Sequence, residues 1–228
     1  MKSIRVASFL TVCLFLFNGC EILALHPLAE GDDVLMDSTK IGTWHELLLP
    51  DELDHIKSVE DSGAFSPEHI ANLRTPPKYE FEKNDKFYSI TKTSYEEVNE
   101  AWTYTSANFD MTLTEIEGQY WASFSQNLGN MPPRSGTIGL RSFLIEAHGM
   151  AKIEFDDDEM RIRFIKYEWF KEVLKKNRMR IDHELVGSGS SPRIILTAST
   201  TQLRALMAKI ATVEEAFEDE YITLTKAS

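Results

Sequence analysis

The sequence predicts a mainly β (α+β) fold, an antiparallel meander of about nine or ten short strands with two packed helices. Three observations lead to this prediction. The 228 residues are 43% apolar, as in ordinary globular domains. From residue 78 onward, apolar side chains alternate with polar ones, and two later segments repeat their apolar side chains at helical spacing. Because an open meander leaves strand edges exposed, we expect the strands to close into a barrel or fold into a sandwich.

Three hairpins follow from the alternation. The first, at 78–93, places Tyr79 and Phe81 on one face ahead of a turn at 83–85. The second turns at Glu117-Gly118, and the third is a hairpin across 149–167. Its acidic tip, "FDDDEM", lacks the spaced oxygens and the glycine of a calcium loop, so we interpret it as a solvated turn.

Two helices interrupt the strands. The segment 168–177 carries Trp169, Phe170, Val173 and Leu174 at helical spacing. A second helix is expected over 199–217, because Ser199 and Gln202 have the spacing of a capping box. Further strands are expected at 179–185, 193–198 and 220–226. The stretch 50–77 reads as irregular apart from a short helix at 67–73, which begins at a proline.

The N-terminus has the pattern of an export signal. Lys2 and Arg5 precede a 12-residue, largely apolar run at 6–17. This run is too short to span a bilayer and has the length of a signal-peptide core. Gly19 and Cys20 follow directly.

Gly19-Cys20 resembles the lipobox of bacterial lipoproteins, in which a small residue precedes the cysteine that becomes the lipidated N-terminus. The resemblance implies cleavage between Gly19 and Cys20 and lipidation of Cys20. Glu21 follows, which in that family favours the outer membrane. The alternative is a non-lipidated signal peptide cut after Ala24.

These observations divide the chain into three parts. We expect a signal peptide at 1–19, a lipidated N-terminus and tether at 20–40, and a single β-rich domain at 41–228. Since the formal net charge is -12, the body is expected to stand away from anionic headgroups.

Gly42-Thr43-Trp44 is similar to the G-x-W signature of lipocalin (calycin)-like barrels, in which the tryptophan closes one end of the barrel. No arginine is clearly placed to stack on Trp44, and the alternative is that Trp44 is plain core. The whole chain also resembles a group of bacterial lipoproteins without an assigned activity, through "GC" at 19–20, "HPL" at 26–28, "GTW" at 42–44 and "ILTAST" at 195–200.

The function predicted from these features is that of an exported, lipid-anchored envelope protein without enzymatic activity. It would bind a small apolar ligand inside a barrel or an envelope partner on its surface. One alternative is a structural or interaction lipoprotein with a filled core. A second is a hydrolase that uses Glu146 and His148, two residues apart on a strand. The acidic composition excludes a nucleic-acid surface, and no cofactor or metal motif is found in the sequence.

Overall fold

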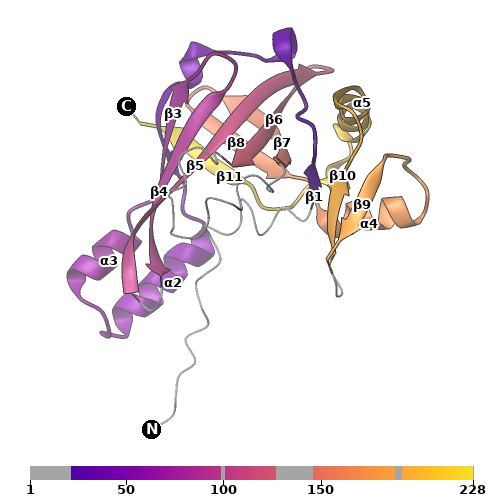
Figure 1. Cartoon of the computed structure of the whole chain (residues 1–228). Coiled ribbons are helices and arrows are strands. Elements are labelled where there is room, and N and C mark those ends of the chain that lie inside the picture. Colours follow the sequence, from indigo (N-terminus) through magenta and orange to yellow (C-terminus); the bar gives the residue numbers. More distant parts are fainter. Residues whose placement is uncertain (1–21, 99–100, 127–145, 188–191, 228) are drawn as a thin grey trace, which may run out of the picture.

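The computed structural model describes residues 22–98, 101–126, 146–187 and 192–227. It is a mainly β protein built around a closed, antiparallel barrel of eight strands, with additional strands and four α-helices (Figure 1). The predicted fold class is therefore confirmed, and the choice between barrel and sandwich is settled in favour of the barrel.

The barrel strands follow one another in space as β6-β5-β4-β3-β2-β11-β8-β7, and pairing of β6 with β7 closes the ring. The C-terminal strand β11 lies between β2 and β8, so strands from both ends of the domain complete the wall. The barrel strands are β2 (Gly42–Glu46), β3 (Lys78–Lys83), β4 (Tyr88–Val98), β5 (Ala101–Ile116), β6 (Gln119–Gln126), β7 (His148–Asp156), β8 (Glu159–Phe164) and β11 (Ile222–Lys226).

The three predicted hairpins are present as β3–β4, β5–β6 and β7–β8. The two-residue turns of β5–β6 and β7–β8 contain residues with positive φ, as such turns require. Glu117 and Gly118 have φ of 51° and 76°, and Asp157 has φ of 46°. The alternating residues of each strand then point in turn into the barrel and out of it.

A small sheet extends the barrel on one side. It contains β1 (Ile22–Ala24), β10 (Arg193–Leu196) and β9 (His183–Val186). β1 pairs with the start of β7 on one edge and, in parallel, with β10 on the other. Two expectations are corrected here. The sheet is not wholly antiparallel, and the tether expected over 20–40 is part of the fold from Ile22 onward.

The physical reason for the second correction is burial. Ala24 and Leu28 are completely buried, so this segment contributes to the core instead of remaining in solvent. Two 3-10 helices, η1 (Gly31–Asp33) and η2 (Ser38–Lys40), then lead the chain to β2.

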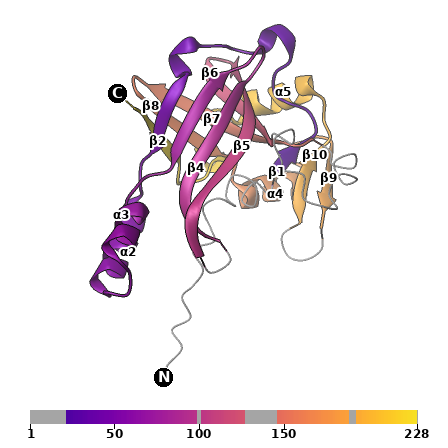
Figure 2. The ribbon, with the colours of Figure 1, turned by 60° about the vertical axis from the view of Figure 1, so that its left-hand side comes forward.

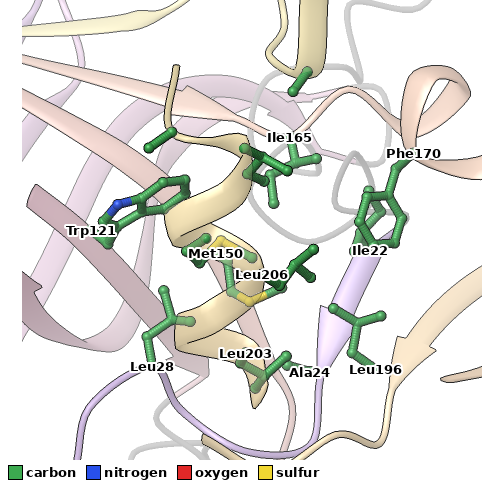
Figure 3. Packing of buried hydrophobic residues seen from close by; sticks show 14 of the residues in the cluster. Ile22, Ala24, Leu28, Trp121, Met150, Ile165, Phe170, Leu196, Leu203 and Leu206 are labelled. Carbon is green, nitrogen blue, oxygen red and sulfur yellow. The ribbon is translucent and has the colours of Figure 1, made fainter. Parts of the chain in front are cut away.

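The structure has two hydrophobic clusters, one inside the barrel and one outside it. The one outside, which we call the second hydrophobic cluster, fills the space between the outer barrel wall and this side layer (Figure 3). Helix α5 (Thr200–Ile210) contributes Leu203 and Leu206, and α4 (Tyr167–Lys175) contributes Phe170. The capping box of Ser199 and Gln202 is formed as predicted. The helix ends at Ile210, earlier than expected, and a further 3-10 helix, η5 (Glu214–Ala216), follows.

Helices α2 (Pro50–Asp61) and α3 (Pro67–Leu73) project from the barrel beside the overhanging ends of β4 and β5 (Figure 2). The predicted helix 67–73 is confirmed. The prediction of irregular structure was wrong for α2. This helix buries only Ile56, so its sequence needs no continuous apolar stripe and shows little helical periodicity. Its start is instead set by Pro50 and by Glu52, whose side chain accepts a hydrogen bond from the Leu49 amide.

Candidate functional site

The barrel interior is occupied by the protein's own side chains. Fifteen buried residues from all eight strands form one cluster there, and its largest members, including Trp44, Phe81 and Tyr88, are at most 2% exposed. Rings on neighbouring strands also contact one another there: Phe109 on β5 and Phe124 on β6 have centroids 6.3 Å apart, edge to face. Small eight-stranded barrels are commonly filled in this way.

Gly42 and Trp44, the predicted barrel-closing pair, lie on β2 beneath η2. The indole Nε1 of Trp44 donates a hydrogen bond to the carbonyl of Lys40 at 3.1 Å. Gly42 has φ of 123°, a conformation that suits glycine alone. No arginine was predicted to stack on Trp44, and the structure places a lysine there: Nζ of Lys226 lies 5.9 Å from the ring centroid.

Lys226 also connects Trp44 to the 3-10 turn above it. Its Nζ donates to the carbonyl of Thr39 at 2.6 Å. At the same end, the amide of Asp37 donates to the Tyr88 hydroxyl at 2.6 Å. Residues 37–40 are therefore held to the barrel by side chains from β4, β2 and β11.

A polar group faces the barrel interior at the end of β2 that lies away from η2, with members on β2, β3 and β4. The Nζ atom of Lys92, a residue only 2% exposed, lies 3.6 Å from Oε2 of Glu46. The Tyr79 hydroxyl donates to the same oxygen at 2.7 Å. Burial raises the pKa of nearby Glu52, and the negative charge of Glu46 raises it further. Sequence reasoning missed this group, although Lys92 follows Tyr88 and Ile90 in the inward-facing phase of β4.

An aromatic cluster joins the helical hairpin α2–α3 to the overhanging β4–β5 ribbon. We define it as Phe65, His69, Tyr95, Trp102 and Tyr104. The His69 ring stacks on Phe65 with centroids 4.5 Å apart and meets Trp102 edge-on at 4.8 Å. Tyr95 lies between Trp102 and Tyr104: its ring centroid is 5.6 Å from that of Trp102 and 5.1 Å from that of Tyr104. The members come from separate parts of the chain, so no local pattern in the sequence indicates them.

His69 is the polar centre of the aromatic cluster. Its Nδ1 lies 3.2 Å from the Tyr95 hydroxyl, and its buried Nε2 has no hydrogen-bond partner among the residues that the structure describes. Burial lowers the pKa of His69, so the neutral ring is favoured. At the outer edge of the aromatic cluster, the Tyr104 hydroxyl donates to the side chain of Asn72 on α3 at 3.1 Å.

A groove of about 500 Å³ opens beside the aromatic cluster, between α2 and α3. Phe65, Ile70 and Ala71 form its apolar wall, and Glu60 and Arg74 form an ion pair across its polar side. The surroundings are apolar as well. Of nine exposed large apolar side chains among the described residues, five lie on this appendage or on the segment leading into it: Leu47, Leu49, Leu53, Phe65 and Tyr104.

Glu146 and His148 lie 4.0 Å apart, measured from Oε1 to Nε2. Burial lowers the pKa of His148. Ser125 is opposite His148 in the β6–β7 register. Within the part of the chain that the structure describes, however, no hydroxyl makes a hydrogen bond to the His148 ring. The pair is therefore not assembled into a nucleophile–base arrangement with those residues.

Gly19 and Cys20, the predicted cleavage and lipidation residues, lie outside the described residues. Among those that are described, no group of three or more His, Cys, Asp or Glu side chains is arranged to hold a metal ion. None of the described helices combines the length and the apolar character needed to cross a membrane.

The described residues form a closed eight-stranded β-barrel with packed helices, a filled interior and an aromatic appendage, and this arrangement fits a lipocalin-like barrel fold. Comparisons of the chain with protein-family models, with curated proteins and with solved structures find no match.

Proposed function

We propose that this protein is an exported, lipid-anchored envelope protein that binds an envelope partner through the aromatic cluster and the adjoining groove. The proposal makes it a non-enzymatic binding protein of the bacterial envelope, with the outer membrane as the favoured location. Anchoring rests on the short apolar run ahead of Gly19-Cys20. Binding rests on the distribution of exposed apolar side chains.

That distribution is the observation that supports partner binding. Tyr104 is 53% exposed and Phe65 is 43% exposed, although both belong to a ring cluster ordered by stacking and hydrogen bonds. Pre-ordered aromatic side chains lose little conformational entropy when a partner covers them. Clustered exposed apolar residues commonly mark interaction surfaces.

The filled interior supports this surface over the alternative of an apolar ligand inside the barrel. A ligand there would have to displace side chains such as Trp44 and Tyr88, which are already completely packed. A native mass spectrum of the purified protein tests that alternative, since a co-purified lipid of constant mass would support it.

The anchor is tested by feeding an alkyne-labelled fatty acid to cells that express the chain. We expect label in the wild-type protein and none in Cys20→Ser. Equal labelling of both proteins, or of neither, would contradict the proposal.

The binding surface is tested by placing a photo-crosslinking amino acid at Tyr104 in living cells. Tyr120 is the matched control, because it is an exposed tyrosine, 38% accessible, on β6. We expect a discrete adduct with one envelope protein at position 104 and none at position 120. The double substitution Phe65→Ala and His69→Ala should reduce the adduct. Adducts of equal yield at both positions would reject this surface.

A further inference from the structure

Strand β9 lies at the outer side of the small sheet and has one free edge (Figure 1). Among the described residues its only neighbouring strand is β10. The strand at the other end of the sheet, β6, has no such edge along its pairing with β7, which closes the barrel. The register of β9 with β10 runs without a bulge, and β9 contains neither lysine nor proline. Bulges, lysines and prolines are common protections of strand edges, so the edge of β9 is open to another strand.

The ladder with β10 determines which backbone groups of β9 point outward. The amide of Thr197 donates to the carbonyl of Asp182 at 2.9 Å, one step beyond the ladder. Hydrogen-bonded pairs alternate along an antiparallel ladder, so every second residue of β9, beginning at Glu184, directs its N–H and C=O groups to β10. His183 and Leu185 direct theirs to the free edge, where no described backbone group bonds to them.

The side chain of Leu185 ends an apolar row that crosses the small sheet. Ile22 is in register with Ile194, and Ile194 is in register with Leu185, so the three side chains lie on one face. Ile22 and Ile194 are buried in the second hydrophobic cluster, whereas Leu185 is 59% exposed. A further strand at this edge would place a side chain opposite Leu185 and continue the row.

We propose that the free edge of β9 pairs antiparallel with the same edge of a second copy of this chain, in a symmetric dimer centred on Leu185. In this register Leu185 lies opposite Leu185 of the second copy, and Glu184 lies opposite Val186 of the second copy. The apolar row then runs through the interface to Ile194 of the second copy. The contact depends neither on a lipid at Cys20 nor on the aromatic cluster.

The charges of β9 disfavour two neighbouring registers. In a dimer centred on Glu184, the two copies of this carboxylate would lie directly opposite each other. In a dimer centred on His183, Asp182 would lie opposite Glu184 of the second copy. Like charges in these positions destabilise an antiparallel pair. The register centred on Leu185 places no carboxylate opposite another and pairs residues 183–187.

The outer face of the sheet supplies a charge that suits a second copy. Arg193 is exposed, is in register with Val186, and forms no ion pair with a described carboxylate. In the proposed dimer, Arg193, Val186 and Glu184 of the second copy share one row. The two charged residues are then separated by two strand spacings, about 10 Å at the backbone, which their long side chains can bridge over Val186. The pairing thus complements charge on one face and apolar surface on the other.

The test compares charge variants of the full chain by sedimentation equilibrium, in mild detergent with micelles in excess over protein. Leu185→Lys and Leu185→Glu each place like charges opposite each other, so each variant alone should be monomeric. An equal mixture of the two should dimerise again, because lysine then lies opposite glutamate. Leu53→Lys is the matched control, since Leu53 is an exposed leucine on α2 and should not affect the dimer.

We expect a concentration-dependent dimer of the wild-type chain, with a dissociation constant that rises at least about tenfold in each single variant. Near-ultraviolet circular dichroism checks that the variants remain folded. A wild-type chain that stays monomeric at its highest soluble concentration would overturn the proposal. A dimer that both charges leave intact would exclude β9 from the interface, and a mixture that stays monomeric would overturn the register centred on Leu185.

Discussion

The Nζ atom of Lys92 and the carboxylate Oε2 of Glu46 lie 3.6 Å apart inside the barrel, where Lys92 is 2% exposed. Tyr79 strengthens the pair twice, since its hydroxyl donates to Glu46 and its ring centroid lies 5.3 Å from the ammonium. A buried charge is tolerated only while its partners remain. The pair therefore links β2 to β4 across the intervening strand β3.

Lys92→Met should destabilise the fold by about 3–5 kcal/mol, because it leaves the Glu46 carboxylate, whose side chain is only 15% exposed, without its cation. Urea unfolding would measure the loss. The control is Lys78→Met, which breaks an exposed pair with Glu80 and should cost at most about 1 kcal/mol. The double variant Lys92→Met, Glu46→Gln should recover part of the loss. Equal costs for the two single variants would contradict a buried pair.

Trp44→Ala should cost about 3–5 kcal/mol, because it removes a completely buried ring and the hydrogen bond to Lys40. Thermal unfolding followed by near-ultraviolet circular dichroism would measure the change. Leu53→Ala serves as the control, since Leu53 is 49% exposed and its truncation should be nearly neutral. A small effect of Trp44→Ala would show that the barrel can be closed without this ring.

Gly42→Ala should destabilise the protein by about 1–3 kcal/mol through backbone strain. A new Cβ would meet its nearest neighbour, Cε of Lys226, at 3.9 Å, so crowding does not explain the cost. Gly63, with φ of 63°, is the matched control, because asparagine tolerates that left-handed conformation and not the φ of 123° at Gly42. Chemical denaturation should thus separate Gly42→Asn, which is destabilised, from Gly63→Asn, which is nearly neutral.

The pKa of His69 is lowered in the folded protein by burial, so the unfolded chain binds a proton more readily. Stability from this group is therefore complete above the unfolded pKa of about 6.5 and is lost as the pH falls below it. His69→Phe keeps a ring in the aromatic cluster and removes the titration. Unfolding free energies measured between about pH 7 and pH 5 should fall less steeply in the variant than in the wild type. Parallel curves would exclude this contribution, since His148 titrates in both proteins.

The parts of the fold that could be predicted from the sequence are those encoded locally. The hairpins at Glu117-Gly118 and at Asp157 could be predicted from the alternation of apolar residues and from their turn residues. Helix α5 could be predicted from its Ser199–Gln202 capping box. The G-x-W spacing also located Trp44 on the first barrel strand. None of these signals requires knowledge of which distant strands pair.

The parts that could not be predicted depend on contacts between distant segments. β1 has three residues, and its strand character comes from β7 and β10, more than 120 residues away. The aromatic cluster unites His69 with Trp102 across the helical hairpin and the ribbon. Lys226 could not be predicted as the cation over Trp44, because the two residues come together only when β11, at one end of the domain, pairs with β2 at the other.

Strand β6 serves two cores with alternate residues: Ala122 and Phe124 face the barrel interior, whereas Trp121 is completely buried in the cluster outside it. The barrel and its side layer consequently share strand β6 as a common wall. Removing either part would expose buried apolar residues of the other. Removal of the N-terminal segment would take Ile22, Ala24 and Leu28 out of the cluster in which Trp121 is buried, so deletions meant to isolate a minimal barrel should yield aggregating material. The domain is therefore expected to melt in a single cooperative transition.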